Sequence, residues 1–205
     1  MSSRSLYIDI GANIGDTIAE QMAAATVDHC WAIEPNPTLC AALRQRFDGQ
    51  RVDIIEMAAW TAAGVMPLYL GDPVSSTLLE GKVTLENYPQ YAITYDQSVE
   101  VQTLDLAQWL RTNVGADDNV IVKMDIEGAE YQVLQHLLDN GAIDLVDEPS
   151  VRISPRTISK RCQCARPHRA RGGRPHQIGH LAIILPRSGS GKKLRQPRLR
   201  QHFSK

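Results

Sequence analysis

The chain has 205 residues, of which 43% are hydrophobic, and this is enough for one substantial α/β domain. Its formal net charge of −1 hides two opposite compositions: residues 1–148 hold all 23 acidic side chains and 7 basic ones, whereas residues 149–205 hold 15 basic and no acidic ones. Four cysteines are too few for a disulfide framework, and the apolar run at 181–185 is too short to span a bilayer. We therefore expect a soluble, cytoplasmic protein with no signal peptide before its first strand and no membrane partner.

The stretch at residues 6–17 reads LYIDIGANIGDT and predicts a buried parallel strand, a glycine turn and then a helix at 18–25. Asp16 or Thr17 is the expected cap of that helix. Gly11 and Gly15 allow positive φ and leave space for a ligand against the backbone. Asp9 is expected where the strand meets the turn, and a carboxylate there would attract a cation or a hydroxyl.

Position 13 is Asn13, so the dinucleotide fingerprint G-x-G-x-x-G is broken, and the Walker A pattern is absent. The acid ahead of Gly11 would also repel a pyrophosphate. A cationic ligand that carries an amino group and a sulfonium suits this stretch better, although the turn could also be purely structural.

The remaining elements alternate between strands and helices. Asn36 is the expected N-cap of the second helix, with Pro37 at its first position, and Pro67 predicts an edge strand. Asp105 is the expected N-cap of the third helix. The expected strands are 30–34, 52–57, 65–70, 99–104, 120–125 and one that begins at 143–146; the expected helices are 38–47, 106–112 and 129–139, and 71–98 is a long loop. This order predicts an α/β fold with a doubly wound, mostly parallel sheet.

Three carboxylates are expected at the carboxyl edge of that sheet, where ligands of such folds bind. They are Asp9, Glu34 and Asp125. Glu34 lies 19 residues beyond Gly15, at the end of the second strand, and could accept hydrogen bonds from both hydroxyls of a ribose.

Several blocks of the chain resemble the FkbM-type methyltransferases. They are YIDIGANIGDT, AIEPNP, AAW, SST, VQTLDLAQWL and VKMDIEGAEYQVL, and they cover about residues 5–148 in the family's order. The resemblance implies a Rossmann-like class I fold and S-adenosylmethionine as cofactor. It implies that Asp9, Gly11, Asn13 and Gly15 hold the methionine end of the cofactor, that Glu34 takes the ribose, and that Met57 and Ala58 border the adenine.

The resemblance also implies O-methylation of a hydroxyl on a sugar, glycan or other secondary metabolite. A hydroxyl acceptor usually needs a base that removes or orients its proton. The candidates are Asp125, Glu127 and Lys123, which lie in and just after the fourth strand of the parallel sheet. For Glu127 and Lys123 a structural salt bridge is an equal alternative. His136 is expected to be a packing or surface residue.

The resemblance stops near Glu148, and the sheet is expected to lack its last strands. Residues 149–205 could be a genuine basic arm that binds nucleic acid, or the translation of a shifted reading frame. A metal module is the third alternative, formed by Cys162, Cys164, His168, His176 and His180. Accordingly, an inactive methyltransferase core and a nucleic-acid binder remain alternatives to the enzyme, with a dinucleotide-dependent oxidoreductase as a more distant one. The sequence does not indicate an oligomeric state.

Overall fold

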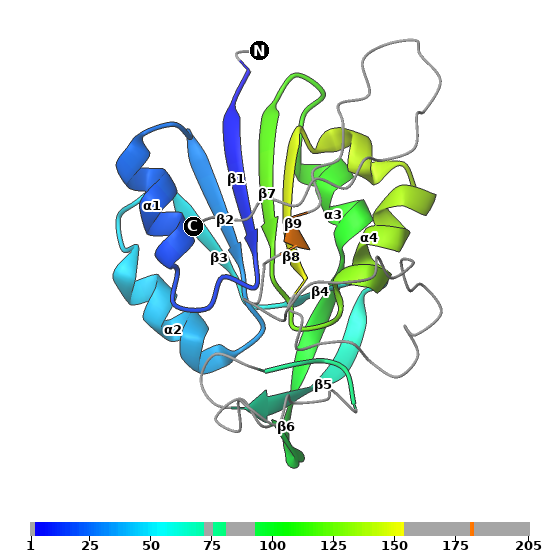
Figure 1. Cartoon of the computed structure of the whole chain (residues 1–205). Coiled ribbons are helices and arrows are strands. Elements are labelled where there is room, and N and C mark those ends of the chain that lie inside the picture. Colours follow the sequence, from blue (N-terminus) through cyan, green and yellow to red (C-terminus); the bar gives the residue numbers. More distant parts are fainter. Residues whose placement is uncertain (1–2, 72–75, 81–92, 154–180, 183–205) are drawn as a thin grey trace, which may run out of the picture.

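The computed structural model describes residues 3–71, 76–80, 93–153 and 181–182, which form two sheets and flanking helices (Figure 1). The strands are β1 (Ser5–Ile10), β2 (His29–Ile33), β3 (Val52–Ile55), β4 (Ala58–Trp60), β5 (Gly64–Gly71), β6 (Ile93–Asp105), β7 (Asn119–Met124), β8 (Glu148–Ile153) and β9 (Leu181–Ala182). The helices are α1 (Asp16–Ala24), α2 (Pro37–Arg46), α3 (Leu106–Asn113) and α4 (Glu130–Asp139), with a short 3-10 helix at Ala142–Leu145.

The larger sheet has the order β3-β2-β1-β7-β8-β9, and all its strand pairs are parallel except β8 with β9. Helices α1 and α2 cover one face, and α3 and α4 cover the other (Figure 1). Side chains of β1 alternate between these faces: Leu6, Ile8 and Ile10 pack in the cluster with α3 and α4, whereas Tyr7 packs with α1 and α2. The predicted doubly wound, Rossmann-like α/β fold is therefore confirmed.

The predicted N-cap residues of α2 and α3 are confirmed. The Asn36 side chain accepts hydrogen bonds from the N–H groups of Thr38 and Leu39, and Pro37 opens α2. Asp105 caps α3 through Gln108 N, at 3.0 Å. The predicted cap of α1 is wrong, because Gly15 occupies the N-cap position in the left-handed conformation and no side chain bonds there.

The smaller sheet has the order β4-β6-β5. Strand β5 is antiparallel to β6 and lies at the edge, as Pro67 predicted. The sequence predicted a strand that ended at residue 57 and no strand at 58–60, where β4 lies. Strand β6 begins at Ile93, inside the predicted loop at 71–98, and residues 72–75 and 81–92 of that loop lie outside the described residues.

The fifth parallel strand does not begin at 143–146. Those residues belong mostly to the 3-10 helix, and the strand starts at Glu148 and continues to Ile153, past the change in composition. Its backbone pairs with β7 from Ile121 to Met124. The predicted Cys/His group and most of the predicted basic tail lie outside the described residues. In the described parts of the chain, no helix is both long and apolar enough to cross a membrane.

Candidate functional site

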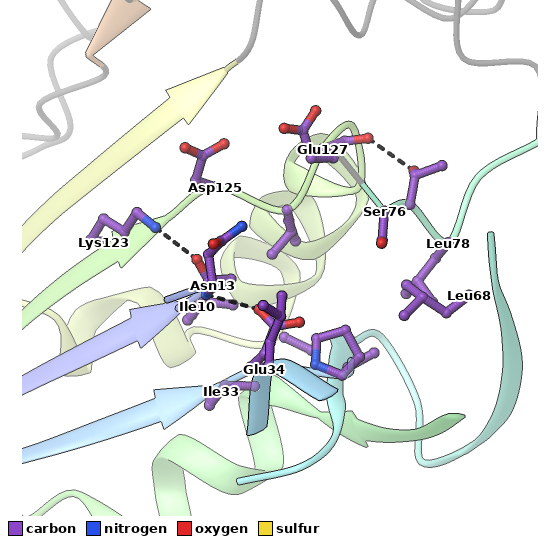
Figure 2. Close-up of a pocket in the computed structure, with 17 residues that line it drawn as sticks. Ile10, Asn13, Ile33, Glu34, Leu68, Ser76, Leu78, Lys123, Asp125 and Glu127 are labelled. Carbon is purple, nitrogen blue, oxygen red and sulfur yellow. Dashed lines mark hydrogen bonds between the residues drawn. The ribbon is translucent and has the colours of Figure 1, made fainter. Parts of the chain in front are cut away.

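A cavity of about 250 Å³ lies at the carboxyl ends of β1, β2 and β7 (Figure 2). Seven of the predicted site residues line it: Gly11, Asn13, Glu34, Ala58, Lys123, Asp125 and Glu127. Asp9, Gly15 and Met57 are not among the lining residues. The structure therefore brings most of the predicted site together at the predicted edge of the sheet.

Glu34 is a buried carboxylate of the cavity wall and is only 6% exposed. One carboxylate oxygen accepts a hydrogen bond from Asn13 N and the other from Asn36 N, each at 2.9 Å. Burial raises the pKa of Glu34, and the two N–H groups and the charge of Lys123 counter part of that rise. Each carboxylate oxygen keeps acceptor capacity for one more donor.

Lys123 and Asp9 form a buried ion pair behind the glycine turn. They are register partners on β7 and β1, their side chains are 12% and 0% exposed, and Lys123 Nζ lies 2.9 Å from Asp9 Oδ1. Lys123 Nζ also donates to the carbonyl oxygen of Gly11, at 2.8 Å, and Thr17 donates its hydroxyl to Asp9. The cation and the hydroxyl that the sequence predicted next to Asp9 thus come from the chain itself. For Lys123 this geometry favours the structural alternative.

Two glycines of the turn each allow another segment of the chain to approach closely. Gly11 has φ +81°, and a Cβ there would lie 2.0 Å from the backbone oxygen of Asp125, so β1 and the segment after β7 can approach only through glycine. Gly15 has φ +82°, and a Cβ there would collide with Leu43 of α2 and with Phe47, which directly follows that helix. Gly11 therefore shapes the cavity wall, whereas Gly15 serves helix packing.

The turn between β7 and α4 carries the two predicted bases. Asp125 and Glu127 line the cavity, and Glu127 adopts φ +54°. Fully buried Glu130 holds this turn by accepting hydrogen bonds from Ile126 N and Gly128 N, both at 2.8 Å. Burial raises the pKa of Glu130, and these N–H groups counter part of the rise. Glu130 belongs to the VKMDIEGAEYQVL block, but no role was predicted for it.

Residues 76–78, which we call the roof segment, close the cavity opposite the strand ends. Thr77 forms a two-hydrogen-bond bridge with the backbone of Tyr69 on β5, and its hydroxyl donates to the carbonyl oxygen of Glu127, at 3.0 Å. Ser76, Leu78 and Leu68 line the cavity on this side (Figure 2). Residues 76–78 lie in the predicted long loop 71–98, whose length is typical of a functional lid or binding loop, and the SST block pointed to Ser76 and Thr77. No individual residue on this side was predicted to have a role.

His136 lies away from the cavity lining, as expected of a packing residue. Its Nε2 is 2.9 Å from Asp105 Oδ1, which joins α4 to the start of α3. Desolvation acts to raise the pKa of Asp105, but its hydrogen bonds with Gln108 N and His136 hold that pKa below its usual value. Among the described residues, no group of His, Cys, Asp and Glu side chains is placed to hold a metal ion.

The family model of the methyltransferase FkbM domain matches residues 9–163 of this chain. A crystal structure of a methyltransferase FkbM from Methylobacillus flagellatus KT is similar, with 17% sequence identity and a TM-score of 0.46. That similarity covers 73% of this chain and 32% of the other, so this chain corresponds to about a third of that protein's length. No curated protein matches the chain. Because the family model covers well over half of the sequence, the chain belongs to the FkbM methyltransferase family.

Proposed function

We propose that the cavity binds S-adenosylmethionine and that the chain transfers its methyl group to a hydroxyl of a small-molecule or glycan acceptor. The observation that supports this most directly is the geometry of Glu34. Its carboxylate lies at the cavity wall, and each oxygen is fixed by one backbone N–H group while retaining a site for another donor. Two adjacent hydroxyls of a ribose match that arrangement.

The rest of the lining fits the same ligand. Asp125 and Glu127 add negative charge, whereas the charge of Lys123 is opposed by buried Asp9. Such a cavity favours a ligand that carries an ammonium and a sulfonium over an anionic one. Ala58 gives an apolar border next to Glu34, as the resemblance implies for the adenine, and the Gly11–Asn13 turn would hold the methionine end.

When bound, S-adenosylmethionine supplies an electrophilic methyl group on sulfur. The chain's own contribution is to orient the acceptor oxygen in line with that methyl group and to take up the proton which the hydroxyl loses. Asp125 and Glu127 are the candidates for this proton transfer, because both carboxylates line the cavity. Lys123 is the weaker candidate, since its ammonium already donates to Gly11 and pairs with Asp9.

The test is isothermal titration of S-adenosylhomocysteine and S-adenosylmethionine into the purified full chain. We expect binding by the wild type and about 10- to 100-fold weaker binding by Glu34→Gln. Glutamine keeps one acceptor oxygen and loses the other, and one hydrogen bond to a charged group is worth about 1.5–3 kcal/mol. The matched control is Glu20→Gln, which removes an exposed carboxylate of α1 and should bind like the wild type. A folded wild-type chain that binds neither ligand would refute the proposal.

The pH dependence of the same titration tests the role of the charge. Because the pKa of Glu34 is raised, the carboxylate is protonated at a higher pH than an ordinary glutamate. The ionised form accepts from both ribose hydroxyls, so affinity should fall on acidification, beginning above the usual glutamate range near pH ~4.3. Glu34→Gln should lack this fall.

A further inference from the structure

Ser76 lines the cavity and carries a buried hydroxyl. Its Oγ is inaccessible to solvent and has no hydrogen-bond partner among the described residues. The same residue lines the cavity, on the side away from Lys123 (Figure 2). A buried hydroxyl that lacks a partner costs free energy, and such groups are most often explained by a ligand or water that satisfies them.

The position of Ser76 is built into the fold. The next residue, Thr77, is bonded to Tyr69 through both of its backbone groups, with distances of 2.8 and 3.0 Å, and its hydroxyl reaches the carbonyl oxygen of Glu127. The roof segment is therefore attached both to β5 and to the turn after β7. This double attachment holds the residue Ser76 at the cavity wall before any ligand arrives.

The surroundings of Ser76 indicate which part of a ligand it would meet. Leu68, Leu78 and Ala58 pack together in one apolar cluster, and all three line the cavity. In the view of Figure 2, Glu34 lies between Lys123 on one side and the residues Leu68, Ser76 and Leu78 on the other. The hydroxyl of Thr77 is already bonded to Glu127, so Ser76 offers the hydroxyl of this apolar wall that has no partner among the described residues. Such a wall suits a flat heteroaromatic base, whose faces are apolar and whose edge carries hydrogen-bonding nitrogens.

We infer that Ser76 is a binding residue for the nucleoside half of the ligand and that its hydroxyl forms a hydrogen bond with the edge of the base. This inference rests on the proposed function, because it takes the ribose to be held by Glu34. Leu68 and Leu78 would then contact the base on the side of the roof segment. The amino-acid half of the ligand would lie on the other side of Glu34, near the glycine turn.

Two probes separate the halves of the ligand. S-adenosylhomocysteine contains both halves, whereas 5′-methylthioadenosine keeps the nucleoside and lacks the amino-acid part. Both are titrated calorimetrically into the full chain as wild type, Ser76→Ala and the matched control Ser98→Ala, which removes an exposed hydroxyl of β6. We expect Ser76→Ala to weaken both ligands by the same factor, about 3- to 10-fold, which corresponds to one neutral hydrogen bond. Ser98→Ala should change neither affinity.

Thermal unfolding without ligand supplies a readout that a purely structural role would not give. Because Ser76→Ala removes a buried group that lacks a partner, the melting temperature of the ligand-free variant should be unchanged or higher. A lower melting temperature would show that the hydroxyl supports the fold and would overturn the inference.

The binding results have clear meanings. A loss confined to S-adenosylhomocysteine would place Ser76 at the amino-acid half, and equal affinities in wild type and Ser76→Ala would remove it from the site; either result overturns the inference. If the folded wild type bound neither probe, the proposed function would fail and the inference with it. If the wild type bound S-adenosylhomocysteine, Glu34→Gln lost that binding and Ser76→Ala had no effect, the inference about Ser76 would be overturned. The proposed function would stand.

Discussion

The cavity is bounded on one side by the ends of β1, β2 and β7, and on the other by the roof segment, residues 76–78. On the strand side, buried charged groups hold the backbone: Lys123 pairs with Asp9, and Glu34 and Glu130 accept from backbone N–H groups. The roof segment is held by neutral hydrogen bonds to Tyr69 and Glu127. A buried charge that loses its partner costs several kcal/mol, whereas a neutral hydrogen bond is worth about 1 kcal/mol. The strand side is therefore expected to respond to substitution much more strongly than the roof segment.

The largest effect is expected for Lys123→Met. This change leaves the carboxylate of Asp9 buried without its cation, and we expect the free energy of unfolding to fall by about 3–5 kcal/mol in urea titrations. The double variant Asp9→Asn with Lys123→Met removes both charges and should recover part of that loss. If the single variant unfolded like the wild type but lost methyl transfer, Lys123 would be catalytic and not structural.

A smaller effect is expected for Gly11→Ala. The new Cβ would lie 2.0 Å from the backbone oxygen of Asp125, at a φ that side chains rarely adopt, so we expect a loss of about 2–4 kcal/mol in stability. The matched control is Gly141→Ala, because Gly141 also has positive φ but no atom within 4 Å of its ideal Cβ. The control should lose only the stability that a side chain costs at positive φ, about 1–2 kcal/mol. Equal losses in the two variants would mean that the close approach of Gly11 to Asp125 contributes nothing.

The smallest effect is expected for Thr77→Val, which keeps the shape of the side chain and removes two neutral hydrogen bonds of its hydroxyl, one donated to the carbonyl oxygen of Glu127 and one accepted from Leu79 N. Urea titration should show a loss of about 1–2 kcal/mol. The effect on S-adenosylhomocysteine binding should be present but modest, because the backbone bridge to Tyr69 remains. A loss of stability as large as that of Lys123→Met would contradict the expected difference between the strand side of the cavity and the roof segment.

Sequence reasoning was most successful where the signal is local. Asn36 and Pro37 indicate the start of α2. Glu34 could be placed at the cavity because it directly follows an apolar strand. Asp125 was placed in the same way. These predictions need only the chain order and the rule that ligands bind at the carboxyl ends of parallel strands.

The features that were missed depend on which distant segments become neighbours. Lys123 reaches Gly11, 112 residues away, because β7 pairs with β1, and no pattern within either strand specifies that pairing. The alternation of β1 points Asp9 toward the face covered by α1, where Thr17 meets it, so it lies behind the turn and not in the cavity lining. The segment that holds Ser76 is attached to the turn after β7 by the hydrogen bond from Thr77 to Glu127, 50 residues further along the chain, which is also a non-local contact.

The buried carboxylate of Glu130 should slow the hydrogen exchange of backbone amides in the turn after β7. It accepts from the amides of Ile126 and Gly128, which belong to no helix or strand ladder, so these two loop amides should exchange slowly in the ligand-free chain. The conformational entropy of this turn is then lost during folding and not during binding. A ligand that arrives at Asp125 and Glu127 should leave the exchange rates of these two amides nearly unchanged.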